Sequence, residues 1–243
     1  MCTVTYIPAH DKFFLTSNRD EKHRRSAALP PQEYEFASGK IYFPKDGDAG
    51  GSWLAVHENG NVIVLLNGGF EKHHPRPPYR KSRGIILLDL IQNSYPSEYF
   101  RSINLENIEP FTLVLFDHQQ LCECRWDGER KHSKLLDNHQ PRIWSSVTLY
   151  DEQTIEKRTE WFKNWLAEQT RISQDDILHF HRFAGDGDRH NDLLMNRGGQ
   201  VFTVSITGIE IEKSGATIKY LDLIANKRHI LPVTFEKAPV THS

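Results

Sequence analysis

Apolar and polar positions near the start of the chain follow a pattern that predicts β-strands. Residues 2–7 and 13–17 are rich in β-branched and aromatic side chains, and Pro8-Ala9-His10-Asp11 between them has the composition of a turn. The second run continues into the polar segment Asn18-Arg19-Asp20-Glu21. The chain is therefore expected to open with a hairpin. Its return strand brings an amide, a guanidinium and two carboxylates close to the chain start.

The rest of the chain alternates between strand and helix patterns. Residues 53–56 and 62–66 are apolar runs joined at Glu58-Asn59-Gly60, and Asn-Gly between such runs is a strong hairpin signal. A helix that is apolar on most sides is expected to begin after Ser82. Further strands are expected at 111–116, 121–126, 201–211 and 217–224. One helix is expected to begin at Asp151. A second is expected to begin at Ser173, as the N-cap, with Asp176 in the third position of the helix. This order favours two sheets between helical layers.

The composition excludes several classes of protein. With 38% hydrophobic and 26% charged residues among 243, the chain is typical of a globular protein rather than a disordered one. A net charge of −2 favours neither nucleic acid nor an anionic membrane as partner. No apolar run approaches the roughly 20 residues that span a bilayer, and the start does not resemble a signal peptide. Three cysteines imply no disulfide framework, so we expect a cytoplasmic location. The chain is expected to form one domain over residues 1–243.

Cys2 places a nucleophile at the start of the chain. If an aminopeptidase removes Met1, the thiol and a free α-amine belong to one residue, and the amine can act as the base. The amine titrates at about 7.7–8.0 and a thiol at about 8.5, so neither needs a large pKa shift to work near pH 7. The alternative is a retained Met1, with Cys2 an ordinary small apolar residue at the start of a strand.

Several short motifs occur in an order that resembles one known family. Besides Met1-Cys2, they are Asn18-Arg19-Asp20-Glu21, Gly50-Gly51-Ser52-Trp53-Leu54-Ala55-Val56, Leu65-Leu66-Asn67, Ser82-Arg83-Gly84, Trp144-Ser145-Ser146 and Thr203-Val204-Ser205. They resemble the NRDE family, also called the transport and Golgi organisation 2 family. That family is similar to N-terminal nucleophile hydrolases of the penicillin V acylase and bile salt hydrolase branch. The resemblance implies an α+β fold, a four-layer αββα sandwich with Cys2 at its centre.

The resemblance also implies roles for Asp20 and Asn67. Asp20 resembles the aspartate that supports the nucleophile in the acylase branch, where it would hold the α-amine and tune its pKa. The alternative is a turn aspartate after a strand. Asn67 resembles the asparagine that donates to the oxyanion, a contribution of about 3–4 kcal/mol to the barrier. The alternative is a turn asparagine before Gly68-Gly69.

Three departures from the acylase branch concern two arginines and the second oxyanion donor. That branch has Arg-Asn-x-Asp where this chain has Ser17-Asn18-Arg19-Asp20, which shifts the arginine by two residues, or about 6.6 Å along a strand. Arg19 is therefore expected either to pair with Asp20 or Glu21 or to contact a substrate carboxylate. In the segment Trp144-Ser145-Ser146 a serine replaces the second donor asparagine, so a backbone N–H would have to serve. The late-strand arginine of the branch has no match near Thr203-Val204-Ser205.

The remaining chemistry-bearing patterns predict no metal site. Cys122-x-Cys124 and His179-x-His181 lack the spacing and the second pair of a zinc site, and Asp186-Gly187-Asp188 is too short for a calcium loop. The basic, proline-rich run 72–81 is either a solvated loop or the rim of a pocket for an anionic ligand.

Three functions are compatible with the sequence and the resemblance. The first is an amidohydrolase that cleaves a non-peptide C–N bond of a small molecule through a Cys2 thioester, with Arg19, Asp20 and Asn67 as the other catalytic candidates and no cofactor. The second is a non-catalytic protein on the same fold that binds or traffics haem or another small ligand, since the resembled family is linked to haem movement. A domain used only for contacts is a third. The sequence leaves open whether the chain forms homo-oligomers.

Overall fold

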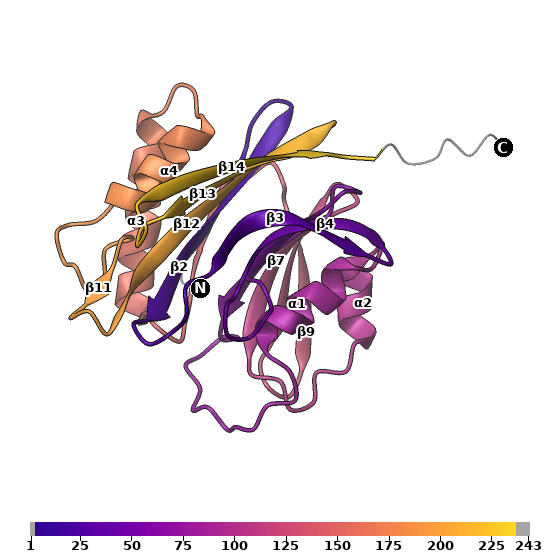
Figure 1. Cartoon of the computed structure of the whole chain (residues 1–243). Coiled ribbons are helices and arrows are strands. Elements are labelled where there is room, and N and C mark those ends of the chain that lie inside the picture. The colour runs from indigo at the N-terminus through magenta and orange to yellow at the C-terminus, as the bar shows by residue number, and fades with distance from the viewer. Residues whose placement is uncertain (1–2, 237–243) are drawn as a thin grey trace.

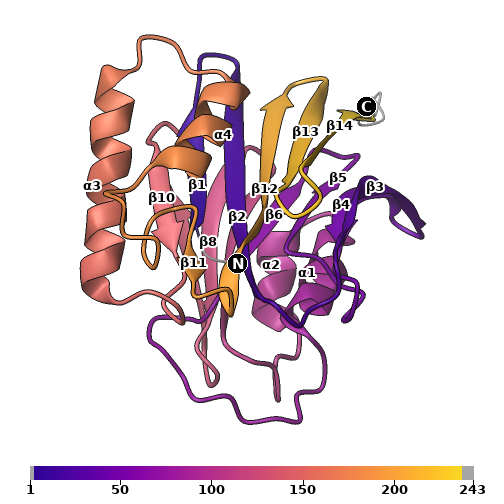
Figure 2. The same ribbon diagram turned by 60° about the vertical axis from the view of Figure 1, so that its left-hand side comes forward.

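The computed structural model describes residues 3–236 and arranges them in four layers (Figures 1 and 2). Two helices, α3 (Glu152–Glu168) and α4 (Gln174–Phe183), cover one face of a sheet that we call sheet A. Sheet B packs against the other face of sheet A, and its own outer face carries α1 (Arg83–Ile91) and α2 (Pro96–Ser102). The predicted α+β fold, a four-layer αββα sandwich, is confirmed.

Both sheets are antiparallel throughout the described residues. Sheet A has the strand order β10-β1-β2-β12-β13-β14, with β11 paired to β12, and sheet B has the order β3-β4-β5-β6-β7-β8-β9. The strands of sheet A are β1 (Thr3–Pro8), β2 (Lys12–Lys22), β10 (Arg142–Ser145), β11 (Asn196–Arg197), β12 (Val201–Glu212), β13 (Gly215–Asp222) and β14 (Lys227–Thr234). Those of sheet B are β3 (Leu29–Phe36), β4 (Gly39–Lys45), β5 (Leu54–His57), β6 (Val62–Asn67), β7 (Phe111–Asp117), β8 (Gln120–Trp126) and β9 (Lys131–Leu136).

Buried apolar side chains form one cluster at each interface between layers. Because side chains alternate along a strand, Leu15 packs between the two sheets while its neighbour Phe14 packs against Phe162 of α3. The third cluster joins sheet B to α1, for example through Ile63 and Leu90. Within residues 3–236, no helix combines the length and the apolarity needed to cross a membrane.

The local signals that predicted turns and helix starts are confirmed. β1 and β2 form the expected hairpin, and β5 and β6 are joined at Asn59-Gly60. Ser82 is the N-cap of α1, where its side chain accepts from the backbone N–H of Ile85. Ser173 and Asp176 form a capping box at the start of α4.

The return strand of the hairpin carries the polar segment 18–21 as expected, since this segment lies inside β2. Asp20 is therefore a strand residue paired with Thr203, and the alternative of a turn aspartate is wrong. The strand expected at 217–224 is present as β13, and one further strand that was not expected, β14, follows and pairs with it. The polar sequence of β14 and its proline, Pro232, hide its pattern, and both are tolerated at the edge of a sheet.

A fully buried histidine ties the first two strands to the helix layer. His181 of α4 has Nδ1 at 2.5 Å from Asn18 Oδ1 and Nε2 at 2.8 Å from Thr5 Oγ1. Asn18 Nδ2 donates to the carbonyls of His181 and Leu193, so its Oδ1 is an acceptor and His181 carries its proton on Nδ1. Burial and the nearby charge of Arg158 lower the pKa of His181 to about 3, which keeps the imidazole neutral.

The free energy of unfolding is expected to fall as the pH drops below about 6.5 because of His181. Its pKa is about 3 in the folded chain against 6.5 in the unfolded chain, so the unfolded chain binds the extra proton between these values. The contribution of His181 to the free energy of unfolding is fully present above pH 6.5. It decreases by up to about 1.4 kcal/mol per pH unit as the pH falls toward 3. Urea unfolding at several pH values measures the slope. It should be shallower in His181→Gln than in the exposed control His10→Gln, and equal slopes would contradict the assignment.

Candidate active site

The first described residue of β1, Thr3, lies between two strands. It pairs with Asn18 of β2 on one side and with Ser145 of β10 on the other. Its hydroxyl accepts a hydrogen bond from Nη1 of Arg158, a fully buried residue of α3. The start of β1 is thus fixed by both neighbouring strands and by the helix layer. Cys2, the predicted nucleophile, lies outside the described residues.

Asp20 lies on β2, two residues beyond the partner of Thr3, with its carboxylate directed toward the helix layer. Its Oδ1 accepts from the hydroxyl of Thr203 at 2.6 Å and its Oδ2 from the hydroxyl of Tyr150 at 2.7 Å. The residue is 4% exposed. β12 has a bulge at Val204, directly after Thr203, and bulges often adjoin functional sites. The carboxylate is therefore held in one position close to the start of β1.

A buried arginine supports this arrangement from behind. Arg158 Cζ lies 3.6 Å from the centroid of the Tyr150 ring, a cation–π contact. The same guanidinium donates to the carbonyl of Asn191 at 3.0 and 3.1 Å and to that of Asp192 at 2.7 Å. One side chain thus orders the loop after α4, the start of β1 and the tyrosine that contacts Asp20.

Asn67 is the last residue of β6, on sheet B. Its carbonyl accepts from the hydroxyl of Ser146, directly after β10, at 2.9 Å, and β6 contacts β1. A cavity of about 10 Å³, close to the size of one water molecule, lies between Asn67, Ser145 and Arg125. Within residues 3–236 the side-chain amide of Asn67 makes no hydrogen bond, so its N–H groups are available to a ligand. Asn67 therefore approaches β1 from sheet B, beside the end of β10.

Arg19 points away from Asp20, into the space between the two sheets. Its Nη2 lies 2.6 Å from Asp46 Oδ2 and 3.3 Å from Glu21 Oε2. Its Cζ lies 4.6 Å from the centroid of the Trp53 ring. Because neighbouring residues of a strand face opposite sides, Arg19 pairs with Glu21 as one interpretation predicted, and not with Asp20.

A cavity of about 340 Å³ opens beside Arg19, and we call it the arginine pocket. Its wall comes from segments far apart in the chain that carry three of the sequence motifs. Charged and aromatic residues of the wall include Arg19, Glu21, Trp53, Lys81, Arg83 and Glu109. The fold therefore brings the motifs around Arg19, Trp53 and Arg83 to one place.

Two glycines allow the wall of this pocket to form. A Cβ on Gly51 would lie 2.5 Å from the carbonyl carbon of Gly84, and one on Gly84 would lie 2.7 Å from the carbonyl oxygen of Ser52. The backbone N–H of Ser52 also donates to the Gly84 carbonyl at 3.3 Å. The motifs that contain these glycines are thus in backbone contact, which explains why both need a residue without a side chain.

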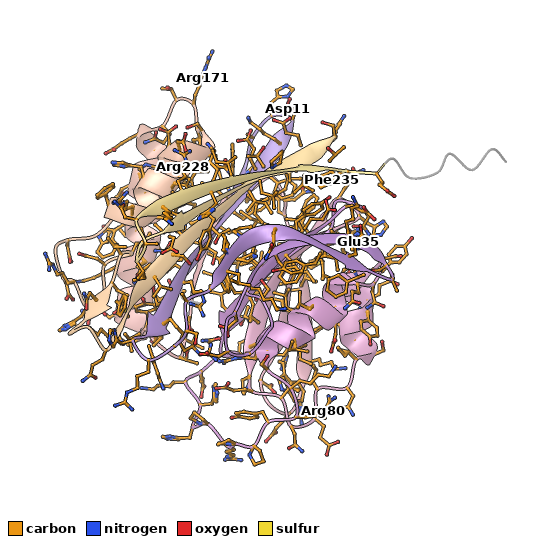
Figure 3. All side chains as sticks on the ribbon, viewed as in Figure 1. Asp11, Glu35, Arg80, Arg171, Arg228 and Phe235 are labelled. Atoms are coloured by element: carbon orange, nitrogen blue, oxygen red, sulfur yellow. The ribbon has the colours of Figure 1, made fainter. Side chains whose placement is uncertain are left out.

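The loop that contains the basic run 72–81 contributes only in part to this pocket. Tyr79 and Lys81 line the pocket. Arg80 instead donates to the backbone carbonyls of Asn104 and Glu106 and lies among the loops at the lower end of the molecule (Figure 3). The predicted rim of a pocket is therefore formed by the end of the run.

The remaining cysteines and histidines of the sequence motifs are placed for structure. Cys122 and Cys124 lie buried on β8, and burial raises the pKa of both thiols, that of Cys124 to about 12. His181 makes the buried contacts described above. In the part of the chain that the structure describes, no three His, Cys, Asp or Glu side chains are placed to hold a metal ion.

Comparison with known families decides the classification. The model of a family described as Transport and Golgi organisation 2 matches residues 1–195, which include every motif except Thr203-Val204-Ser205. The chain belongs to this family. No curated protein matches its sequence.

Solved structures show that this Transport and Golgi organisation 2 chain shares a fold with N-terminal nucleophile hydrolases. A Caenorhabditis elegans orthologue of N-acylethanolamine-hydrolyzing acid amidase aligns with a TM-score of 0.54 and 12% identity over 86% of this chain and 92% of that chain. A cysteine-to-alanine mutant of conjugated bile acid hydrolase from Clostridium perfringens aligns with a TM-score of 0.55 and 10% identity over 99% and 100%. Another variant of that hydrolase gives 0.56 and 11% over 98% and 100%.

Several residues of the site in this Transport and Golgi organisation 2 chain were missed by reasoning from the sequence. Tyr150 lies shortly before a helix, and Glu109 lies directly before Pro110. No local pattern marks either residue. Asp46 lies in an Asp-Gly-Asp turn, where aspartate is common for other reasons. Arg158 did have a signal, because it lies on the apolar stripe of its helix.

Proposed function

We propose that the chain is an N-terminal cysteine amidohydrolase that cleaves a non-peptide C–N bond of a small molecule through a Cys2 thioester. The Asp20 carboxylate carries this proposal, because it is buried and held by the hydroxyls of Tyr150 and Thr203. Cys2 directly precedes Thr3 in the sequence, and Asp20 lies on the paired strand, two residues past the partner of Thr3. A fixed carboxylate so close to the chain start can orient an α-amine and raise its pKa.

The proposed reaction begins when the α-amine of Cys2 takes the thiol proton and the sulfur attacks the amide carbon. The oxyanion that forms accepts hydrogen bonds from the Asn67 side chain and from a backbone N–H near Ser145. The C–N bond then breaks, the α-ammonium gives its proton to the leaving amine, and the acyl group remains on sulfur. Water, activated by the same amine, attacks the thioester, which releases the acid and restores the thiol.

The solved structures support the proposal at the level of fold. All three carry names of hydrolases, one for N-acylethanolamines and two for conjugated bile acids. At 10–12% identity the likeness concerns the fold alone. The geometry around Thr3, Asp20 and Asn67 supplies the rest of the argument.

Mass spectrometry of the native protein tests the proposal. We expect an intact mass without Met1 and one adduct from a thiol-reactive acyl probe, mapped to Cys2 and absent in Cys2→Ala. Cys122 and Cys124 are suitable internal controls, because burial raises the pKa of both and keeps them as thiols at neutral pH. A retained Met1, or labelling that persists in Cys2→Ala, would rule out the hydrolase.

Binding without turnover is the alternative, and the arginine pocket is the observation that favours a ligand of some kind. Its described lining contains no His, Cys or Met, and Tyr79 is its one side chain of a type that ligates haem iron. A charged lining favours a small polar ligand over haem. Titration with haem, followed by absorbance, is expected to show no saturable change at micromolar concentrations.

A further inference from the structure

The carboxylates of the arginine pocket have little capacity left to accept hydrogen bonds. Asp46 Oδ1 accepts from the backbone N–H groups of Asp48 at 3.1 Å and Ala49 at 2.8 Å. Its Oδ2 accepts from Arg19 at 2.6 Å and Arg25 at 3.1 Å. Burial alone would raise its pKa, but the Ala49 N–H and the two guanidiniums hold the pKa of Asp46 below its usual value. This carboxylate is therefore ionised and fully engaged.

The other two carboxylates are engaged in the same way. Glu21 Oε1 accepts from the N–H of the following residue at 3.0 Å, and Oε2 accepts from Arg25 at 3.3 Å. Glu109 Oε1 lies 3.1 Å from His73 Nε2, and its Oε2 lies 3.1 Å from Arg83. Each oxygen of both side chains thus has a partner within the protein.

Donors, in contrast, are in surplus. A guanidinium carries five N–H groups, yet in the described part of the chain Arg19 contacts carboxylates through Nη2 only. Arg83 donates from Nη1 to the Pro110 carbonyl at 3.3 Å and contacts Glu109 through Nη2, which leaves Nε without an acceptor among residues 3–236. The indole N–H of Trp53, in a side chain that is 3% exposed, also has no partner there. The pocket is therefore complementary to an acceptor.

The charges around the pocket balance one another. Lys81 pairs with Asp89 at 2.6 Å, and Arg19, Arg25 and Arg83 face the three carboxylates of the lining. Burial outweighs the attraction of Glu109 and lowers the pKa of Arg83, so the nearby carboxylate does not fully compensate this guanidinium. An anionic acceptor would stabilise the charged form of this guanidinium.

We propose that the arginine pocket binds the carboxylate of a small-molecule ligand through the unused donors of Arg19 and Arg83. Combined with the proposed function, on which this part rests, the ligand is an amide substrate with a carboxylate on one side of the scissile bond. Two oxygens in one plane match the fork of a guanidinium, which is why arginine recognises carboxylates well. A cavity of about 340 Å³ lies in the size range of ligand pockets.

Calorimetric titration of the Cys2→Ala protein tests binding without turnover. The probes are N-acetylglycine and N-decanoylglycine, each compared with its uncharged carboxamide, and inorganic phosphate. We expect each acid to bind about tenfold or more tightly than its carboxamide and more tightly than phosphate. The double variant Arg83→Gln/Glu109→Gln, which removes one charge of each sign, should bind acid and carboxamide alike. Arg83→Lys, which keeps the ion pair but not the fork, should fall in between.

A second ion pair supplies a matched control. Arg228 of β14 and Asp175 of α4 pair at 2.7 Å through exposed side chains. Figure 3 shows Arg228 far from Arg80, whose chain neighbours Tyr79 and Lys81 line the pocket. Arg228→Gln/Asp175→Asn should therefore bind the acids as the parent does. Equal affinity for acids and carboxamides, no acid binding at millimolar concentration, or undiminished binding in both Arg83 variants would overturn the proposal.

If Cys2 labelling succeeds while acid binding fails, the enzyme acts on uncharged amides. If binding succeeds while labelling fails, the pocket belongs to a carboxylate-binding protein without turnover.

Discussion

Arg158→Ala is expected to lower the free energy of unfolding by about 3–5 kcal/mol. The guanidinium is fully buried and donates to Thr3 and to the carbonyls of Asn191 and Asp192. Alanine would leave these buried acceptors without donors and open a cavity beside Tyr150. Removal of a buried charge offsets part of the loss, but the uncompensated polar groups outweigh it.

Urea denaturation followed by tryptophan fluorescence measures this loss. Arg171→Ala is the control, since Arg171 is exposed at the far end of the same helix layer and its side chain extends into solvent (Figure 3). We expect a change within about 0.5 kcal/mol for this control. A loss below about 1 kcal/mol in Arg158→Ala would mean that water or a rearranged loop replaces the guanidinium.

Arg158 also shows what a sequence pattern can and cannot reveal. It stands three residues after Ile155 and four before Phe162, so it lies on the stripe that predicts the buried face of the helix. A charged residue on such a stripe is a signal for a buried polar network. Its partners could not be predicted, because Thr3 and Asn191 are far from it in the chain and no spacing rule connects them.

The fold was predicted best where local chemistry determines the structure. The hairpin at Asn59-Gly60 and the N-caps Ser82 and Ser173 follow from turn and capping preferences that act within a few residues. The strands at the sheet edges were missed, namely β3, β9, β10 and β14, and so were the interior strand β4 and the two-residue β11. Edge strands are exposed on one side and tolerate proline and charge, so their sequences carry little of the apolar pattern.

The candidate site was predicted in its parts but not in its arrangement. The motifs around Arg19, Trp53 and Arg83 were found as separate segments of one resemblance. Their meeting in one pocket depends on the packing of sheet A on sheet B, and it requires the contact between Gly51 and Gly84. Glu109, which completes the pocket, has no sequence signal, since an isolated glutamate before a proline is ordinary.

Asp20→Asn is expected to slow acylation of Cys2 by about 10²–10⁴-fold under the proposed function. Asparagine has the same shape and keeps one acceptor, so β2 should keep its pairing with Thr203. It removes the negative charge that stabilises a protonated α-amine, and it turns an amide N–H₂ toward a hydroxyl donor, either that of Thr203 or that of Tyr150. The rate of labelling by the acyl probe measures the effect without knowledge of the substrate.

The pH dependence of that rate separates a direct role from a structural one. The amine acts as the base in its neutral form, so the rate falls on the acid side of its pKa. Loss of the Asp20 charge lowers this pKa, and the acid limb of the profile should move to lower pH in Asp20→Asn. Tyr150→Phe, which keeps the charge and removes one donor, should slow labelling without the same shift. Asp175→Asn, an exposed carboxylate, should change neither quantity. If Cys2 of Asp20→Asn is labelled at the parent rate and the acid limb of the pH profile does not move, Asp20 does not support the nucleophile. Its contacts with Tyr150 and Thr203 would then serve only to join β2 and β12 to the segment before α3.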